Sequence, residues 1–513
     1  ESIIKNGFTM RGHHYVFFSA SAGQIRTKKF VAIREDLLER CMPALTCGLS
    51  IADINEQGGV NVNKYLAYLA LSNSSTEVWR DFDIDRCIVV DDFETVVRSE
   101  VDFIDEKDFS ISREMHDVPI THTDGCGMIL PQVSDKNFMV RAPWVKGLLS
   151  PFPFDKFIRQ ADERNPEVNH AIIKDIYGQE HDVLKEHIEV IFCKSQFKMA
   201  KYYPSWQAYK DNFKKYHCTA GKCNIEPQRI GRATINYQML QTLTSMTDAE
   251  LNSICNTTRK TLSRICGDKK TMMDCLGVRQ RMGAQQTYFQ KCLAMYPEML
   301  RDEYCKEQLR DIRTSIMNDA RAGKLMIDGK YQFLIPDLYA ACQYWFEGIA
   351  VPSGLLANGE VWTKQYAAAD KLDVLRSPHL YKEHAVRHNV CRDRPEIRDW
   401  FNTNGIYTST FDCISKILQF DNDGDKALVV AEPTLVKVAE RECQDVVPLY
   451  YPMAKAAPQE LMSEAFYHGM VAAWTGGNIG TISNKITKVW NSPEPDVDAV
   501  KILCMINNFV IKS

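Results

Sequence analysis

Residues 421–425 read Asp-Asn-Asp-Gly-Asp, three carboxylates at alternate positions. They follow the mainly apolar run Ile417–Phe420 and precede Ala427–Ala431, and both runs predict strands. Such carboxylates converge only where the backbone bends tightly, which Gly424 permits. Left unpaired they would repel and raise one another's pKa, and a divalent cation relieves that repulsion. Oxygen ligands with few carboxylates suit Mg²⁺, which borrows further oxygens from a substrate phosphate. The predicted ligands are Asp421, Asp423 and Asp425.

Two other interpretations fit the same run. In an EF-hand calcium loop, the three aspartates and Glu432 would stand at positions 1, 3, 5 and 12. That pattern needs glycine at position 6, where this chain has Lys426, and helices rather than strands on both sides. A solvated acidic turn is the plainer alternative, because Asn and Gly are common turn residues. Taken alone, the run supports a turn and a metal site about equally.

Composition sets the limits on what the chain can be. It has 513 residues, 45% hydrophobic and 25% charged, with a net charge of −4. The length predicts two or three folded units. The charge argues against a general polyanion binder but leaves room for a basic channel. The 17 scattered cysteines and the lack of an 18-residue apolar run predict a cytoplasmic protein without a membrane span. Because the chain opens on Glu1 and stops after an apolar run, we expect a segment of a longer protein.

Hydrophobic periodicity alternates along the chain between strand-like and helical patterns. Strand-like segments include His13–Ser19, Phe138–Arg141, Val190–Cys193 and Tyr331–Ile335. The predicted segments are 1–110, an α/β region; 111–201, a first β unit; 202–325, a helical insert; 326–450, a second β unit; and 451–513, a helical region interrupted at Gly476 and Gly477. This order predicts an α+β fold.

Two stretches of the helical insert have ambiguous roles. Lys201–Tyr216 interleaves aromatic residues with lysines, a pattern that could stack and track a nucleic-acid strand. A helix that packs its aromatic stripe on the β unit is the commoner use of such a pattern and is favoured here. The cations of Arg259–Arg264 and Lys269-Lys270 could touch phosphates or simply solvate a helix face. The sequence does not decide between these two roles.

The acidic run resembles the metal loop, Asp-x-Asp-Gly-Asp, of the two-barrel RNA polymerase superfamily. In that superfamily two double-psi β-barrels face each other across the active site. The look-alikes are the eukaryotic RNA-silencing, RNA-dependent RNA polymerases and single-subunit phage RNA polymerases. Asn422 departs from the family, which has an aromatic or aliphatic residue there. Upstream, Gly354–Trp362 resembles the strand pair that opens the second barrel. Residues 376–381 resemble the family's Arg-x-Pro-x-Leu-His element, with Tyr381 in place of the histidine.

The first β unit carries matching elements. Residues 123–127 (Thr-Asp-Gly-Cys-Gly) resemble the family's Asp-Gly-x-Gly turn, Val140–Leu149 its Arg…Lys-Gly strand, and Cys193–Lys201 the strand with a second lysine. The resemblance implies two active-site lysines, an arginine near the ribose of the incoming nucleotide and a further substrate-binding arginine. These are Lys146 and Lys198, Arg376, and Arg141. Two cations opposite a metal–carboxylate cluster are what a triphosphate needs. Each alone would more often be a solvated side chain.

The motifs keep the family's order from Ser19 to Trp490, and the family pattern continues beyond this terminus with a further lysine-bearing element. The implied fold is α+β, with two double-psi β-barrels in one catalytic core, a helical insert between them and a helical C-terminal region. The implied function is template-directed RNA synthesis, a nucleotidyl transfer from ribonucleoside triphosphates onto an RNA product. Two Mg²⁺ ions, with Mn²⁺ as a substitute, would orient the RNA 3′-hydroxyl and stabilise the pyrophosphate leaving group.

Three alternatives stay open at this stage. The compact chain favours a phage-like enzyme on a DNA template, in the cytoplasm of a bacterial or phage-infected cell. An RNA template would use the same residues. A barrel protein that binds calcium, or nothing, is the alternative from another class, and calcium binding without nucleotide dependence would support it.

Overall fold

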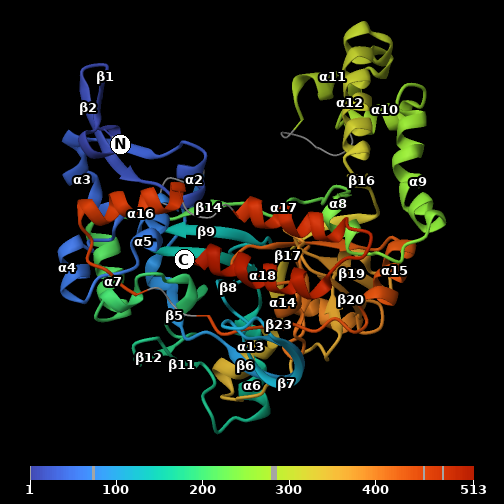
Figure 1. Ribbon diagram of the computed structural model, residues 1–513. Helices are drawn as coiled ribbons and strands as arrows, with labels where there is room; N and C mark the ends of the chain where they lie inside the picture. The colour runs from blue at the N-terminus through green and yellow to red at the C-terminus, as the bar shows by residue number, and fades with distance from the viewer. Residues whose placement is uncertain (1, 72–75, 279–285, 454–456, 476–478, 513) are drawn as a thin grey trace.

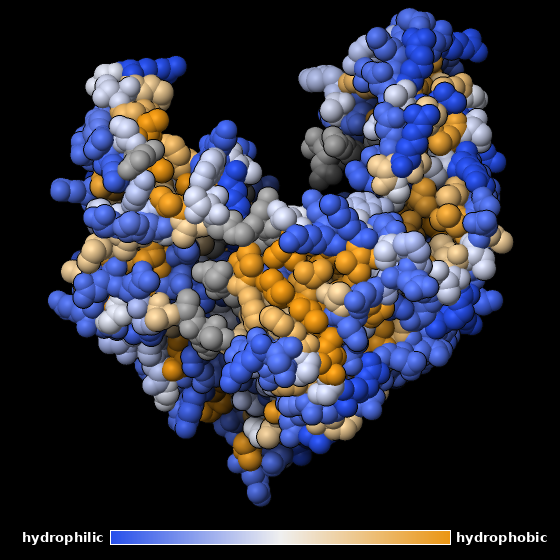
Figure 2. All heavy atoms as spheres, viewed as in Figure 1, coloured by the Kyte–Doolittle hydropathy of each residue, from blue (hydrophilic) through white to orange (hydrophobic). Residues whose placement is uncertain are grey.

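The computed structural model describes residues 2–71, 76–278, 286–453, 457–475 and 479–512. The chain forms a mixed α+β body from which two projections rise, with a notch between them (Figures 1 and 2). One projection carries the N-terminal strands β1 (Phe8–Met10), β2 (His13–Ser19) and β3 (Val31–Arg34). The other is an arm of helices α9 (Asp248–Arg264), α10 (Lys269–Cys275), α11 (Tyr288–Met295) and α12 (Glu303–Arg321). The predicted α+β class is confirmed.

The first β unit is a seven-stranded sheet in the order β4-β14-β9-β10-β8-β13-β5. Its strands are β4 (Glu77–Val78), β5 (Cys87–Val90), β8 (Cys126–Ile129), β9 (Phe138–Ala142), β10 (Val145–Pro151), β13 (Val190–Cys193) and β14 (Gly221–Cys223). The pairs β10/β8 and β13/β5 are parallel, and the other pairs are antiparallel. Strands β4 and β5 come from the segment 1–110 and β14 from the segment 202–325, so this sheet gathers strands from three of the predicted segments.

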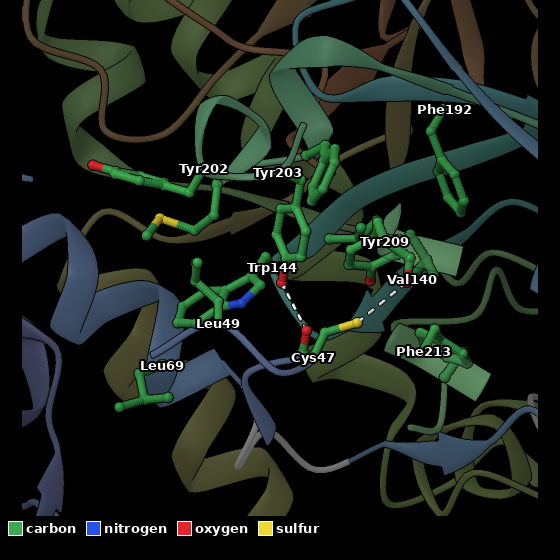
Figure 3. Close-up of a cluster of buried hydrophobic side chains, with 14 of the residues drawn as sticks. Cys47, Leu49, Leu69, Val140, Trp144, Phe192, Tyr202, Tyr203, Tyr209 and Phe213 are labelled. Carbon is green, nitrogen blue, oxygen red and sulfur yellow. Dashed lines mark hydrogen bonds between the residues drawn. The ribbon is translucent and has the colours of Figure 1, made fainter. Parts of the chain in front are cut away.

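An aromatic helix packs on this sheet. In α7 (Trp206–Lys215) the side chains of Trp206, Tyr209 and Phe213 are buried, and Figure 3 shows Tyr209 and Phe213 in one cluster of buried side chains with Trp144 of the β9–β10 turn. The Tyr209 hydroxyl donates to the Pro143 carbonyl at 2.7 Å. The prediction that this stripe packs on the β unit is confirmed.

The second β unit is a closed barrel of six strands in the order β17-β21-β18-β20-β19-β22. The strands are β17 (Gly329–Pro336), β18 (Glu360–Trp362), β19 (Lys371–Leu375), β20 (His384–Asn389), β21 (Ile406–Thr408) and β22 (Lys426–Val430). Its interior is apolar, and Leu334, Val361, Val374, Ile406 and Val429 are fully buried there. Closure leaves the barrel without an exposed strand edge, which makes it a rigid base for the loops at its ends.

Two local predictions in this unit are wrong. Ile417–Phe420 is not a strand: the short helix α14 (Ile414–Ile417) ends there, and Gln419 takes a left-handed φ of 54°. Leu418 and Phe420 are buried all the same, and a short apolar run cannot distinguish a buried turn from a strand. Within Gly354–Trp362 only β18 is a strand, so the barrel does not open on a strand pair there.

A long hairpin and the last two helices pack against the barrel. The hairpin is β6 (Glu94–Ile104) with β7 (Ile111–Thr121), and β23 (Leu449–Tyr450) adds to β6 in parallel. The helices are α17 (Ile479–Trp490) and α18 (Val497–Lys512), whereas α16 (Ser463–Thr475) packs on α2 (Ala22–Arg26) and α5 (Val62–Leu71) in the N-terminal region. Lys501 of α18 pairs with the buried Asp102 of β6 at 3.0 Å. Gly476 and Gly477, where an interruption is predicted, lie outside the described residues. No helix among the described residues is long and apolar enough to cross a membrane.

One buried carboxylate joins the two β units. Glu226, 4% exposed, accepts from the side chain of Asn137 at the start of β9 and from the Asn404 backbone N–H at 2.6 Å, before β21. Burial raises the pKa of Glu226, and these hydrogen bonds oppose the rise.

We expect Glu226→Ala to destabilise the joint between the units, because the backbone and side-chain N–H groups of Asn137 and the backbone N–H of Asn404 lose their acceptor. The cost should be about 2 kcal/mol, seen as a lower midpoint of thermal unfolding. Glu163→Ala, which removes an exposed carboxylate of α6 (Phe154–Arg164), is the control and should change the midpoint little. Equal midpoints for the two variants would contradict the role assigned to Glu226.

Candidate active site

The acidic loop 421–425 connects α14 to β22 and lies against the first β unit. Asn422 is buried, and its side-chain N–H donates to the His122 carbonyl at 2.7 Å. Gly424 has a φ of 121°, and a Cβ placed there would lie 2.7 Å from the Met139 methyl group of β9. The residue that departs from the family pattern thus holds the loop against the opposing β unit by a hydrogen bond in place of an apolar contact.

The turn 122–125 of the first β unit meets this loop at very close range. Gly125 has a φ of 78°, and a Cβ built on it would lie 2.7 Å from Asp423 Cα. Its backbone N–H donates to Ser195 Oγ at 2.7 Å, and the Ser195 hydroxyl donates in turn to Asp92 at 2.6 Å. Only glycine provides both the left-handed conformation and the missing side chain at this contact.

Two of the predicted cations meet two of the predicted carboxylates. Lys146 Nζ of β10 lies 3.0 Å from Asp423 Oδ2, so the pair spans the two β units. Arg376, which follows β19, lies 2.8 Å from Asp425 Oδ2 and also donates to the Gln419 carbonyl. All four side chains are 23–30% exposed. Asp421 is exposed at the start of the loop.

The other two predicted cations lie nearby without an ion pair to the loop among the described contacts. Lys198 donates to the Ser195 carbonyl. Burial and then the charge of Lys146 lower the pKa of Lys198, while Asp124 and Asp423 oppose that shift. Arg141 stands opposite Lys146 in the β9–β10 register and donates to the Val140 carbonyl at 2.8 Å. Its side chain lines a separate cavity of about 160 Å³ with His217 and Cys218.

A fourth carboxylate belongs to this cluster and is not among the predicted site residues. Burial, together with repulsion from Asp421 and Asp423, raises the pKa of Asp124 to about 6, while the charge of Lys198 opposes the rise. Burial also raises the pKa of Asp425, with Asp423 and Asp421 adding to the shift. The signal was present in the sequence, because Asp124 is the acidic residue of the Asp-Gly-x-Gly turn.

The crowded carboxylates fit a divalent cation in their chemistry. Their ligand atoms are all oxygens, and their mutual repulsion raises the pKa of two of them. The three aspartates do not converge on one point, since Asp423 turns to Lys146 and Asp425 to Arg376. Among the described residues, the group with metal-compatible spacing is Asp370, His388 and Asp393. This group lies at the opposite end of β19 from Arg376, because Asp370 precedes the strand and Arg376 follows it. Both ring nitrogens of His388 already face carboxylates, that of Asp370 at 2.6 Å and that of Asp393 at 2.9 Å.

A cavity of about 400 Å³ opens beside the loop. Arg376, Asp421 and Glu383 line it from the barrel, and Tyr451 and Asn508 line it from the C-terminal region. Burial raises the pKa of Glu383 to about 8. The side chain of Gln419 donates to Glu383 at 3.3 Å and accepts from Asn508 of α18 at 2.7 Å. The upstream end of the loop is therefore tied to the C-terminal helix.

Comparison with known proteins gives this geometry a context. No protein-family model matches the sequence. The DNA-directed RNA polymerase YonO of Bacillus phage SPbeta is 48% identical to this chain over 510 residues. The chain is a homologue of this phage RNA polymerase. The match covers 99% of this chain and 59% of the phage protein, so the chain spans less than two thirds of the length of its relative.

A structural relative agrees with this homology. The RNA-dependent RNA polymerase QDE-1 from Thielavia terrestris matches 99% of this chain, and 58% of its own, with a TM-score of 0.54. At 13% identity this likeness shows the fold alone. The resemblance to silencing and phage RNA polymerases, predicted from the motifs, is confirmed.

We expect Gly125→Ala to push the acidic loop away from the turn 122–125. The left-handed backbone and the crowded Cβ together should cost about 2–3 kcal/mol, measured as a fall in the thermal unfolding midpoint. Gly178→Ala is the matched control, because Gly178 has a similar φ of 88° with nothing within 4 Å of its Cβ position. A fall no larger than that of the control would contradict the close contact with Asp423.

Proposed function

We propose that this chain is the core of a template-directed RNA polymerase that joins ribonucleoside triphosphates at the acidic loop. The observation that carries the proposal is the pairing of Asp423 with Lys146 and of Asp425 with Arg376, across and beside the joint of the two β units. The pairing supports the proposal because a substrate triphosphate needs cations beside carboxylates that suit a divalent cation. The name of the phage relative, a DNA-directed RNA polymerase, agrees with it.

Each side chain has a role in this proposal. Asp421, Asp423 and Asp425 bind divalent cations, with Mg²⁺ as the resident ion and Asp124 close by. When bound, the ions activate the RNA 3′-hydroxyl and stabilise the leaving pyrophosphate. Lys146 and Lys198 hold the triphosphate, Arg376 contacts the ribose, and Arg141 assists from the neighbouring strand. Lys146 exchanges its carboxylate partner for phosphate oxygens, and Arg376 exchanges its partner for the ribose, when cation and substrate enter together.

The template we propose is DNA, because the phage relative is named a DNA-directed enzyme. The alternative is an RNA template, as in the name of the structural relative. The same catalytic residues serve both, so the choice rests on how the duplex is held. We further propose that the reaction takes place in the cytoplasm of the bacterial host cell.

The finer architecture belongs to the same proposal. We infer that the seven-stranded sheet and the six-stranded barrel are the two double-psi barrels of the catalytic core. The chain segments divide at residues 110, 201, 325 and 450 in this proposal. Strands β4, β5 and β14 come from outside the segment 111–201 and contribute to the first barrel.

A calcium-binding barrel is disfavoured by the local structure. Glu432, the twelfth position of an EF-hand loop, caps α15 (Pro433–Cys443) by accepting from the Leu435 N–H at 2.7 Å. Lys426, the sixth position, begins β22. The downstream half of the loop is therefore strand rather than ligand-bearing turn.

Asp423→Ala and Asp425→Ala should each abolish incorporation of labelled ribonucleotides on a primed template, because each removes a proposed metal ligand. Asp311→Ala, which removes an exposed aspartate of α12, should leave incorporation unchanged. Circular dichroism and the unfolding midpoint report whether each variant is folded. Incorporation that survives in a folded Asp423→Ala or Asp425→Ala protein would refute the proposed site.

Matched DNA and RNA templates of one sequence should distinguish the two polymerase activities. We expect extension on DNA to exceed extension on RNA by about tenfold or more, a difference of about 1.4 kcal/mol in transition-state binding. The measurement is the initial rate of primer extension at equal template concentration. Faster extension on RNA would overturn the choice of DNA and leave the catalytic site untouched.

A further inference from the structure

A pocket lined by three cations lies at the root of the helical arm. Its volume is about 290 Å³, and its lining residues are Arg232, Thr257, Lys260, Thr261, Arg264 and Thr271. They come from three places: the segment before β15 (Thr234–Ile235), the second half of α9 and the first turn of α10. On α9, Lys260 and Arg264 are four residues apart, so they share one helix face. No carboxylate lines the pocket.

The pocket is firmly attached to the catalytic body. The Thr258 hydroxyl of α9 accepts from the backbone N–H of Met326 in β16 (Leu325–Met326) at 2.9 Å. Strand β16 pairs with β15, directly after Arg232. The Ala233 N–H donates to the carbonyl of Gly329, the first residue of β17. A group held in this pocket would therefore keep a defined position relative to the barrel.

The three cations lack the ion pairs that their neighbours make. Among the described residues, Arg441 pairs with Glu250 of α9 at 2.7 Å, and Arg259 donates to Asn252 at 2.7 Å. Arg232, Lys260 and Arg264 make no ion pair within this described part of the chain. Hydrogen bonds from Thr271, and to a smaller extent the charge of Arg264, lower the pKa of Asp268. The Asp268 carboxylate caps α10 by accepting from the backbone and side chain of Thr271 at 2.8 and 2.6 Å.

The chemistry of the pocket suits a phosphate group. Like charges on one helix face repel one another, and an anion between them relieves the repulsion. Guanidinium and ammonium groups are donors only, which matches phosphate oxygens that are acceptors only. All three cations are exposed, so the pocket is open enough for a chain to pass along it. Exposed cations of this kind contact nucleic-acid backbones without reading sequence.

We propose that Arg232, Lys260 and Arg264 form a binding site for a phosphate group of the nucleic-acid backbone, outside the catalytic loop. The proposal rests on the polymerase function proposed above, because it requires that the chain hold a template or product strand. It assigns a role to two of the Arg259–Arg264 cations, Lys260 and Arg264, which the sequence alone left between phosphate contact and solvated surface. The site positions the strand by charge and leaves sequence choice to base pairing.

The test compares Lys260→Gln and Arg264→Gln with Arg259→Gln in binding of a fluorescein-labelled primed DNA template. Arg259→Gln removes the same charge from the same helix outside the pocket, so it controls for the general field of the arm. Anisotropy titrations over a range of NaCl concentrations give the slope of log Kobs against log[NaCl]. Each pocket variant should reduce the magnitude of that slope by about one, and weaken binding equally for unrelated sequences. The control should keep the wild-type slope.

Two outcomes would overturn the proposal of a phosphate site. If Arg259→Gln lowers the slope as much as the pocket variants, the contact is a diffuse field and not a site. The pocket variants could instead bind template as the wild type does, yet show a higher KM for ribonucleotides or no binding of inorganic phosphate. In that case the pocket binds a free phosphate compound and not the nucleic-acid backbone. A folded Asp423→Ala protein should bind template with the wild-type slope and fail to incorporate. Failure of the proposed function, meaning no incorporation by the unaltered chain, is thus seen separately from failure of the phosphate site.

Discussion

The contact between the acidic loop and the turn 122–125 is the constraint on which the rest of the site depends. Gly125 brings the backbone of the first β unit within van der Waals contact of Asp423. Asn422 then bonds to His122, and Lys146 reaches Asp423 from β10. Because interiors this closely packed cannot give way, the positions of the carboxylates on one unit set the positions of the cations on the other. The buried Glu226 secures the same joint away from the loop.

The charges at this joint serve position more than stability. Lys146, Arg376 and their aspartates are each about a quarter exposed, and ion pairs near solvent contribute little to the free energy of folding. Each pair keeps a cation and a carboxylate within 3.0 Å. A divalent cation and a phosphate can replace the internal partners with little movement of the backbone. Under the proposed function, the pairs hold in the absence of substrate the charges that a triphosphate requires.

Two other contacts extend the control of the loop to distant segments. Gln419 connects the loop to Glu383 in the barrel and to Asn508 in α18. Trp490 of α17 donates to the Leu380 carbonyl at 2.8 Å, just beyond Arg376. Helices α17 and α18 thus contact Leu380, four residues beyond Arg376, and Gln419, whose carbonyl accepts from Arg376. The arm is rooted on the same barrel through β15 and β16, which places its cations and the loop on one rigid base.

The sequence alone determined the features that depend on neighbours along the chain. The bounds of β2, the aromatic stripe of α7, the strand at Phe138–Arg141 and the acidic run follow from residue type and spacing, whereas Arg376 was found through the family resemblance. Such signals are local: a period of two or 3.6 residues, a glycine at a bend, carboxylates in succession. The family resemblance came from the same short motifs, and the homology to a phage polymerase confirmed it.

Only the tertiary structure decided which of these motifs meet. Lys146 and Asp423 are 277 residues apart, and no periodicity encodes a contact at that separation. Asp124 joined the cluster only when the turn 122–125 met the loop. Ile417–Phe420 became a helix end and a left-handed turn, because closing the barrel buries its apolar side chains without needing a strand. Strand β14 belongs to the predicted helical segment but pairs in the first sheet. The reason is related, since backbone pairing partners are neighbours in space and not along the chain.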